Sequence, residues 1–563
     1  MDFSANNPAK PTMRPWLHQN WGHLAGIAML VLASIGLIRI AFLNAFAADE
    51  IAFFVWGSSM LQDPEFQGIG SPLFRLNEAG YGSSYWTLYV NLIDWFETDA
   101  FWILRTLACI AFVSIPVSIA VVGNMAKPKF GYLLAALWLT MPIAWWCGKI
   151  TGPETFALAM AVYGVLLLYS DSHLRESLSP RMAQVVAPLG WILIGGAVSL
   201  KLTMMPTAIF AFLLHFTFPM KEGKSLKTVS LKMFHVTGLM ACGFLLMTPI
   251  VIFDSAAFVQ RIVTLPSGEA WSWMIAKTSL NNHIWGWDGV FSGGLVQWSL
   301  CPLAFLILAG MLLIKQRRVF LILLISFLAC WLMIASKGAL LGWYWFGWIP
   351  MIVLSLLWVL KPDQPNRGLI ATVASVILIN LLFQTPDIVE RYSMKSQQAI
   401  SLTQRSSVQQ ALSEITNGKS YDLVLDYWEV SHVGGLEFPK SGASELVQMT
   451  PPETNFVSDR RSSKDSAPRR FDPGVVKANA FCRIHDMGTY GTEGKSVLVV
   501  VSKRLASKHA FADFDRFLTE RVIPNSPDQT TYSRIVDLPE TAIYEIHSGA
   551  SVAGLVNHAD SSR

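Results

Sequence analysis

Acidic side chains stand beside two apolar stretches of the sequence, where they could act on a substrate at a membrane surface. Asp49 and Glu50 follow the apolar run 23–46, and Glu154 precedes the run 155–170. A carboxylate in such a place can accept the proton of a hydroxyl group as a general base. An acidic residue also suits the first turn of a helix, where the helix dipole favours it. Both interpretations stay open. Asp49 is our candidate for the base, with Glu50 and Glu154 as further catalytic candidates.

Four basic residues near the ends of apolar stretches could bind an anionic group such as the phosphate of a lipid. They are Lys201, Arg261, Lys277 and Lys337. A simpler interpretation exists for each, because a lysine at a span end can extend its side chain to the membrane surface, and a loop cation needs no ligand. We expect two further cations, Arg39 and Arg105, to be internal ion partners of Asp49 or Glu50 rather than ligands.

Four aromatic or imidazole side chains could contact the polar groups of a sugar or of its acceptor. They are Tyr81, Tyr85, His283 and Tyr344. The tryptophans of the segment 254–293 indicate a membrane-interface belt more than a platform for a sugar. Two carboxylates could hold a divalent cation, but no group of Asp, Glu, Cys and His has the spacing of metal ligands. We therefore expect no metal and no other cofactor.

The composition places these residues in a membrane protein. The 563 residues are 52% hydrophobic and 15% charged, and their mean hydropathy is +0.41, which lies outside the range of soluble globular proteins. A net charge of +4 gives no support for a nucleic-acid partner. About eleven apolar runs could cross a bilayer, the shorter ones beside neighbouring helices. They are 23–46, 101–124, 131–148, 155–170, 186–200, 202–219, 233–253, 294–314, 319–335, 344–360 and 368–384.

Along the chain, connections rich in Lys and Arg alternate with connections that are poor in them. The basic set includes 127–129, 221–232 and 315–318, and the positive-inside rule assigns it to the cytoplasm. An odd number of spans from a cytoplasmic N-terminus then puts the loops 47–100 and 254–293, and the part after residue 385, outside. The charged residues at membrane depth all fall toward that side, which predicts a polar cavity there. The expected location is a bacterial inner membrane, with the C-terminal part in the periplasm.

The distribution of charge divides the chain into two domains. Residues 1–384 form the predicted transmembrane domain, with its two long outer loops. Residues 385–563 hold more charged side chains than the first 384 and form a soluble α/β domain without a recognisable catalytic motif. Its predicted elements are a helix at 396–416, strands at 421–427 and 496–502, a helix at 509–522, and a strand or hairpin at 532–547.

Two amphipathic helices are predicted in the first outer loop, at 50–62 and 84–97. In the second, Trp86, Leu88 and Leu92 are the candidates for facing the membrane. Such helices lie in the interface between water and hydrocarbon and could support the charged residues beside them.

Several short motifs follow one another in an informative order. They are Ala48-Asp49-Glu50 after the first span, the segment 80–86 in the first outer loop, Gly152-Pro153-Glu154 at the fourth span, the segment 199–203 between two short spans, and Tyr344-Trp345 with Pro350 in a late span. This order resembles the GT-C membrane glycosyltransferases, and within them the group of protein O-mannosyltransferases and lipid A aminoarabinose transferases. The segments 424–428 and 496–500 resemble the soluble tail of bacterial members.

The resemblance implies a GT-C-like fold with about 11 membrane helices and a C-terminal extracytoplasmic α/β domain. It also implies an inverting transfer of one sugar from a polyprenyl-phosphate donor to a hydroxyl group of a glycolipid, of lipid A or of a protein, on the outer face of the membrane. The residues that carry it are those already selected by their chemistry, with Asp49 as the base and Lys201 as a phosphate ligand.

Two other classes of function are compatible with many spans. A transporter or flippase for a lipid or solute is the first, but carriers coupled to ions need acidic residues near mid-membrane, and the apolar runs contain none there. A membrane anchor that presents the soluble domain as a binding module is the second. It leaves the charged residues at the outer face unexplained.

Overall fold

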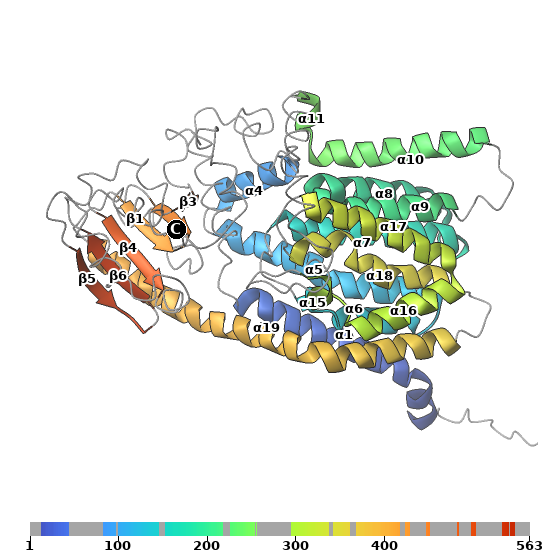
Figure 1. Ribbon diagram of the computed structural model, residues 1–563, viewed down its shortest axis with the longest axis horizontal. Helices are drawn as coiled ribbons and strands as arrows, with labels where there is room; N and C mark the ends of the chain where they lie inside the picture. Colours follow the sequence, from blue (N-terminus) through green and yellow to red (C-terminus); the bar gives the residue numbers. More distant parts are fainter. Residues whose placement is uncertain are drawn as a thin grey trace, which may run out of the picture.

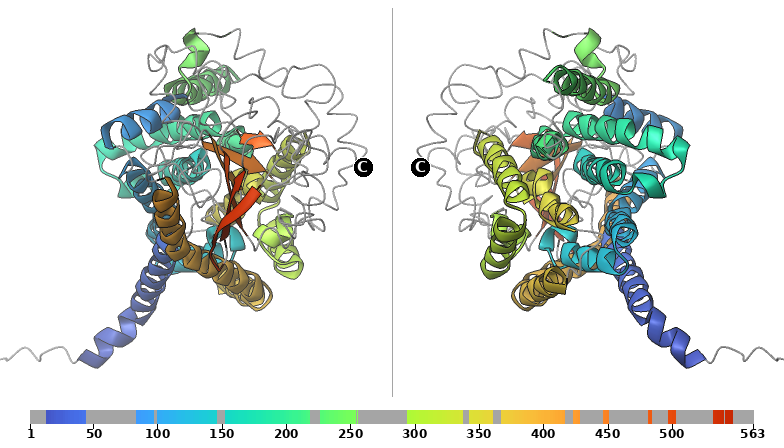
Figure 2. Two further views of the ribbon diagram at one scale, coloured as in Figure 1. Left: turned by 90° about the vertical axis from the view of Figure 1, so that its left-hand side faces the viewer. Right: turned by 90° about the vertical axis from the view of Figure 1, so that its right-hand side faces the viewer.

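A bundle of helices makes up most of the computed structural model, and a small sheet lies at one end of it (Figure 1). The structure describes residues 13–43, 83–96, 99–145, 152–217, 226–253, 255, 294–336, 342–360, 367–416, 423–427, 446–450, 481–483, 497–502, 532–539 and 541–546. Viewed from the two ends of the bundle (Figure 2), the helices surround a common interior. The helices α1 and α19 contact each other along one edge.

Each of the eleven predicted apolar runs coincides with helical structure over its described residues. The longer elements are α1 (Met13–Leu43), α5 (Asp99–Ala126), α6 (Phe130–Leu139), α7 (Pro153–His173), α8 (Pro180–Leu200), α9 (Met205–Thr217), α10 (Leu226–Met247), α16 (Pro302–Lys315), α17 (Arg317–Ser336) and α19 (Arg367–Thr416). Short helices and 3₁₀ turns complete the runs: η2 (Pro142–Trp145), η4 (Leu202–Met204), α11 (Ile250–Phe253), α15 (Leu295–Trp298), η6 (Gly342–Gly347), α18 (Ile349–Ser355) and η7 (Leu356–Val359). A further turn, η3 (Arg175–Ser177), follows α7.

Six of the described helices are long and apolar enough to cross a membrane. They are the apolar parts of α1, α5, α7, α8, α10 and α19. Several other runs are broken by 3₁₀ turns, as in α6 with η2 and α18 with η7, so they form shorter apolar helices. Shorter segments of this kind need neighbouring helices to satisfy their backbone groups within hydrocarbon. The protein is therefore a helical membrane protein, as its composition predicts.

Close helix packing is clearest between α8 and α10. A Cβ atom added at Gly195 of α8 would collide with the carbonyl oxygen of Met240 in α10. Small residues allow such close approach of helix backbones in membranes, where van der Waals contact is a main source of association. This contact fixes α10 against α8, although most of the surface of α10 faces outward.

Two buried amides attach α19 to the rest of the bundle. Asn380 donates from Nδ2 to the backbone oxygen and to Oγ1 of Thr140, at 3.0 Å each, and its Oδ1 accepts from the backbone N–H of Cys301 at 2.8 Å. One turn later, Gln384 donates to the backbone oxygen of Val296 at 2.8 Å. These bonds set the position of α19 along its axis, because each amide meets backbone groups of another element.

The C-terminal strands form one mixed sheet in the order β3-β2-β1-β4-β6-β5. The strands are β1 (Leu423–Tyr427), β2 (Leu446–Thr450), β3 (Phe481–Arg483), β4 (Val497–Ser502), β5 (Tyr532–Asp537) and β6 (Thr541–Ile546). The first four are parallel to their neighbours, and β4, β6 and β5 pair antiparallel. The predicted strands at 421–427 and 496–502 and the predicted hairpin are confirmed, whereas β2 and β3 were not predicted. The predicted helices at 50–62 and 509–522 lie outside the described residues.

The helix α19 is one continuous helix of 50 residues that passes through residue 384 and ends at Thr416. It joins the predicted last span to the predicted helix 396–416, and it leads from the bundle toward the sheet (Figure 1). The predicted domain boundary at 384/385 therefore falls inside a helix.

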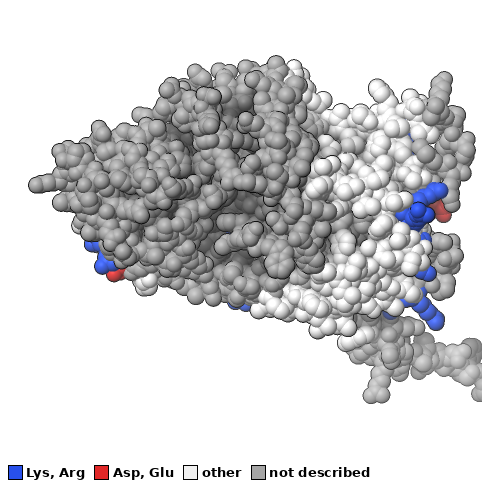
Figure 3. Space-filling model, viewed as in Figure 1, with Lys and Arg blue, Asp and Glu red and all other residues white. Residues whose placement is uncertain are grey.

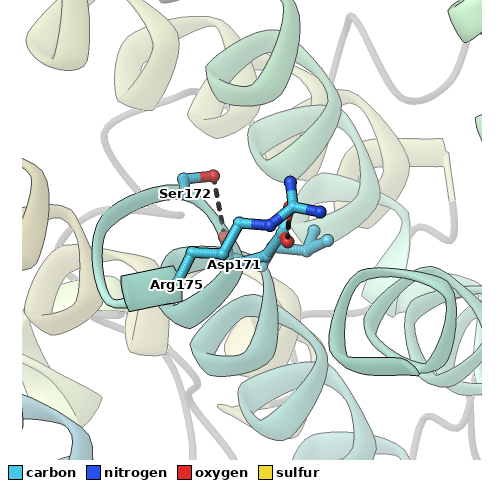
Figure 4. Close-up of polar contacts among 4 residues, drawn as sticks. Asp171, Ser172 and Arg175 are labelled. Atoms are coloured by element: carbon cyan, nitrogen blue, oxygen red, sulfur yellow. Dashed lines mark hydrogen bonds and ion pairs between the residues drawn. The ribbon is translucent and has the colours of Figure 1, made fainter. Parts of the chain in front are cut away.

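Among the described residues, the two ends of the bundle differ in charge. Lys and Arg residues gather at the end away from the sheet (Figure 3), where α5 meets α6, α7 meets α8, and α16 meets α17. At this end Asp171 and Arg175 form an ion pair of 3.9 Å one turn apart, and Ser172 donates to the backbone oxygen of Leu168 (Figure 4). We call it the basic end and the opposite end the sheet end.

Candidate functional site

A buried ion pair lies at the sheet end of the bundle. The Nζ of Lys201 donates to Oε1 of Glu154 at 2.6 Å. Glu154 stands in the first turn of α7, and Lys201 directly follows the last residue of α8. Because α7 and α8 are antiparallel neighbours joined at the basic end, the start of one and the end of the other meet at the sheet end.

The local sequence explains how both side chains reach this place. Gly152 is extended and Pro153 takes the first helical position of α7, where its missing N–H costs nothing. Glu154 then falls in the first turn, where a carboxylate is favoured by the helix dipole. Lys201 is extended (φ −150°, ψ 113°) and ends α8 before the 3₁₀ turn η4 begins at Leu202.

The ion pair is largely removed from water. The side chain of Glu154 is 4% exposed and that of Lys201 is 28% exposed. Taking a carboxylate out of water costs several kcal/mol, and a close cation must offset that cost. A buried ion pair often contributes little to the stability of a fold compared with apolar side chains of similar size. A functional role for Glu154 and Lys201 is therefore favoured over a purely structural one.

Aromatic side chains from α4 (Ser83–Phe96) lie next to the start of α7. The ring of Tyr85 is 5.6 Å from the ring of Phe156 between centroids, and Trp86 and Tyr89 contact Tyr85. The prediction of a helix at 84–97 is confirmed by α4. The prediction that Trp86 and Leu92 face the membrane is wrong: both are buried, and only Leu88 of the three is exposed. One face of α4 packs on the bundle instead.

Hydroxyl groups tie the surrounding helices to α10. Ser84 of α4 donates to the backbone oxygen of Leu246 at 2.7 Å. Ser199 of α8 donates to the backbone oxygen of Phe244 at 2.9 Å and also bonds the hydroxyl of Thr248. These contacts hold the end of α8, and with it Lys201, against the end of α10.

The turn η6, which includes Tyr344, packs on the turn that follows Lys201. A Cβ atom at Gly347 would collide with the backbone oxygen of Thr203, so this approach requires glycine. Thr207 donates from Oγ1 to the backbone oxygen of Gly347 at 2.7 Å. The η4 and η6 turns are thus held together directly beside the ion pair.

Arg105 is a second buried cation toward the sheet end. It lies in the second turn of α5, and its residue exposure is 0%. The chain after α5 reaches the basic end at Lys127, so Arg105 belongs to the opposite half of the helix. A charge in this position, facing the interior of a membrane bundle, is the kind that marks a functional region.

The structure thus brings together Glu154, Lys201, Tyr85 and the backbone around Tyr344, whose side chain is not described. The other predicted site residues lie outside the described residues: Asp49, Glu50, Tyr81, Arg261, Lys277, His283 and Lys337. Within the described part, no group of three or more His, Cys, Asp and Glu side chains could hold a metal ion. Trp86, Tyr89 and Phe156 pack against Tyr85, and Thr203 lies two residues after Lys201; none of the four was predicted as a site residue. Their positions depend on helix packing, for which the sequence carries no local signal.

Comparison with known proteins places the fold. No protein-family model matches the sequence, and no curated protein is significantly similar to it. The solved structure of ArnT from Cupriavidus metallidurans bound to undecaprenyl phosphate superposes with a TM-score of 0.50 at 11% identity, over 95% of this chain and 99% of that chain. Its apo structure gives 0.49 at 11% identity, over 96% and 99%. The chain therefore has an ArnT-like fold, and the predicted GT-C resemblance is confirmed at the level of the fold.

Proposed function

We propose that the protein is a glycosyltransferase that moves one sugar from a polyprenyl-phosphate donor to a hydroxyl group. The observation that carries the proposal is the buried pair of Glu154 and Lys201 at the sheet end of an ArnT-like bundle. A cation beside the membrane surface suits a lipid phosphate. The ArnT structure with this fold contains undecaprenyl phosphate, which supports a lipid donor of the same chemical class.

The proposed reaction is a single displacement. The acceptor oxygen attacks the anomeric carbon of the sugar while Asp49, as the base, takes the proton of the hydroxyl group. The bond from that carbon to the phosphate oxygen breaks, and its electron pair leaves with the polyprenyl phosphate. Attack opposite the leaving group inverts the anomeric centre. Because the leaving phosphate gains negative charge, a fixed cation lowers the barrier.

Lys201 supplies that cation in the proposal, with no metal ion or cofactor. Glu154 holds the ammonium group in place, and it can orient the acceptor hydroxyl at the same time. Tyr85 lies on the adjoining wall and can contact the sugar or the acceptor. Glu50, Tyr81, His283, Tyr344 and the cations Arg261, Lys277 and Lys337 remain proposed members of the same site.

The proposed orientation follows from the distribution of charge. Basic connections face the cytoplasm in membrane proteins, so the basic end is the cytoplasmic end. The sheet end and the buried pair then face the periplasm of a bacterial inner membrane. The acceptor is a glycolipid, lipid A or a protein that presents a hydroxyl group at this depth.

The test is transfer of radiolabelled sugar from a set of polyprenyl-phosphate donors to a membrane extract. We expect transfer by the purified protein, and a loss of about 10²- to 10⁴-fold in Asp49→Asn, the size of a general-base contribution. Glu154→Gln should also lose transfer, whereas the control Asp171→Asn at the other end of α7 should not.

The outcomes separate the alternatives. Equal transfer by wild type and Asp49→Asn would assign the base to Glu154 or Glu50 and make Asp49 a helix cap. Absence of transfer from every donor, together with movement of lipid across liposome membranes, would replace the transferase by a flippase.

A further inference from the structure

Thr203 carries a buried hydroxyl group that makes no hydrogen bond within the described part of the chain. The residue is 3% exposed, and its Oγ1 has no hydrogen-bond partner. Two nearby buried hydroxyls show the usual arrangement: Ser199 bonds Thr248 and the backbone of α10, and Thr207 bonds the backbone of Gly347. Buried polar groups in folded proteins are nearly always paired, so the exception requires a reason.

The position of Thr203 relates it to the proposed donor site. It follows Lys201 by two residues, on the η4 turn that leaves α8 at the buried ion pair. The η4 turn contacts α7, which carries Glu154, and η6. The backbone of Thr203 packs directly against Gly347 of η6. A Cβ atom added at Gly347 would collide with the backbone oxygen of Thr203. The turn that carries this hydroxyl group is therefore fixed against η6.

A hydroxyl group held in this way is prepared for a ligand that brings its own acceptor. A phosphate group has several anionic oxygen atoms, and a hydroxyl that donates to a charged acceptor makes a stronger hydrogen bond than one that donates to a neutral group. The ammonium group of Lys201 has three N–H donors, one of which reaches Glu154, so one lysine can hold a carboxylate and a phosphate oxygen together.

We propose that Thr203 is a ligand of the donor phosphate, and that its hydroxyl group donates to a phosphate oxygen bound by Lys201. This inference rests on the proposed function and extends it to a residue that the sequence did not select for chemistry. Donor binding then supplies the hydrogen bond that the protein alone does not make. The unpaired hydroxyl is a cost to the stability of the protein without ligand, and a gain for the affinity of the lipid.

The experiment measures binding of polyprenyl phosphate, without a sugar, to the purified full-length protein in nanodiscs. Thr203→Val keeps the shape of the side chain and removes the hydroxyl group, and Thr203→Ser keeps the hydroxyl group. We expect Thr203→Val to bind about 10- to 100-fold more weakly, the range for a hydrogen bond to a charged group. Thr203→Ser should stay close to wild type. Inorganic phosphate and the uncharged polyprenol, tested as competitors, show whether the lipid phosphate as a whole is recognised.

Thermal unfolding of the same variants in the absence of lipid provides the second readout. Thr203→Val should unfold at the same temperature as wild type or higher, because it removes a buried hydroxyl group that has no partner. The matched control Thr207→Val should unfold at a lower temperature, because it removes the bond to Gly347. A loss of binding combined with unchanged or higher stability is not expected from a merely structural residue.

The outcomes distinguish this inference from the proposed function. If Lys201→Gln loses binding and Thr203→Val binds as wild type, the role of Thr203 is wrong and the proposed donor site stands. If wild type binds no polyprenyl phosphate, the proposed function fails and this inference fails with it. Competition by the uncharged polyprenol but not by inorganic phosphate would overturn the assignment of Thr203 to the phosphate group.

Discussion

Helix α7 has an ion pair at each end, and the two pairs differ in length and in the exposure of the cation. At the sheet end, Glu154 and Lys201 are 2.6 Å apart, and the side chain of Glu154 is 4% exposed. At the basic end, Asp171 and Arg175 are 3.9 Å apart (Figure 4), and their side chains are 16% and 65% exposed. Exposed pairs contribute about 0–1 kcal/mol and are screened by salt. The comparison shows that a short distance and low exposure, rather than the presence of an ion pair as such, distinguish a candidate functional charge from an ordinary surface charge.

The largest loss of stability should come from replacing Lys201, the cation of the buried ion pair. Lys201→Met leaves the carboxylate of Glu154 buried without its cation. We expect a loss of roughly 3 kcal/mol in the free energy of unfolding, the lower end of the range for a buried pair, because Lys201 is itself partly exposed. Reversible unfolding in mixed detergent micelles measures this change.

A matched double variant sharpens that result. Glu154→Gln with Lys201→Met removes both charges and should regain most of the lost stability, since no buried charge is left unpaired. It should not regain binding of polyprenyl phosphate. Recovery of both properties would mean that the pair acts only on folding.

A smaller loss of stability is expected when the uncharged, buried hydrogen bonds of Asn380 are removed. Asn380→Leu removes the acceptor of the Cys301 N–H and the donor to Thr140. Leaving such backbone groups buried without partners should cost about 2 kcal/mol. Donor affinity should be unchanged, so a parallel loss of affinity would contradict the special role given to the pair. Thr372→Ala, at an exposed position of the same helix, is the control and should stay within about 0.5 kcal/mol of wild type.

The smallest effect is expected at the basic end. Asp171→Asn removes a long ion pair whose cation is 65% exposed, and it should change the free energy of unfolding by less than about 0.5 kcal/mol, with no change in transfer or lipid binding. A loss comparable to that of Lys201→Met would show that the two ends of α7 are equivalent, and the comparison would fail.

Much of the fold was predictable because hydropathy is a local property. All eleven apolar runs became helical, and strands rich in valine, such as β4, were found from their composition. Interruptions were not predicted, because 3₁₀ turns such as η2 and η7 arise where packing overrides a uniform apolar run. The strands β2 and β3 were not predicted, and β3 has only three residues.

The sequence allowed individual residues of the candidate site to be predicted, but it did not predict which of them contact each other. Glu154 and Lys201 were selected separately, one beside the acceptor and the other beside the phosphate, because each stands at a span end. Their pairing depends on the antiparallel packing of α7 and α8, which joins residues 47 positions apart. Trp86 shows the opposite failure: its apolar character was seen, but the side that it faces depends on how α4 packs on the bundle, where Trp86 is buried.

The length of α19 has a mechanical consequence. At a rise of 1.5 Å per residue, its 50 residues span about 75 Å, whereas the hydrocarbon of a bilayer is about 30 Å thick. The part beyond the bilayer is therefore a lever longer than the part inside it. Membrane helices tilt when the bilayer becomes thinner, and a tilt of about 10° would swing the far end by roughly 8 Å. Membrane thickness thereby becomes a variable that sets the position of the sheet relative to the end of the bundle that holds Glu154 and Lys201.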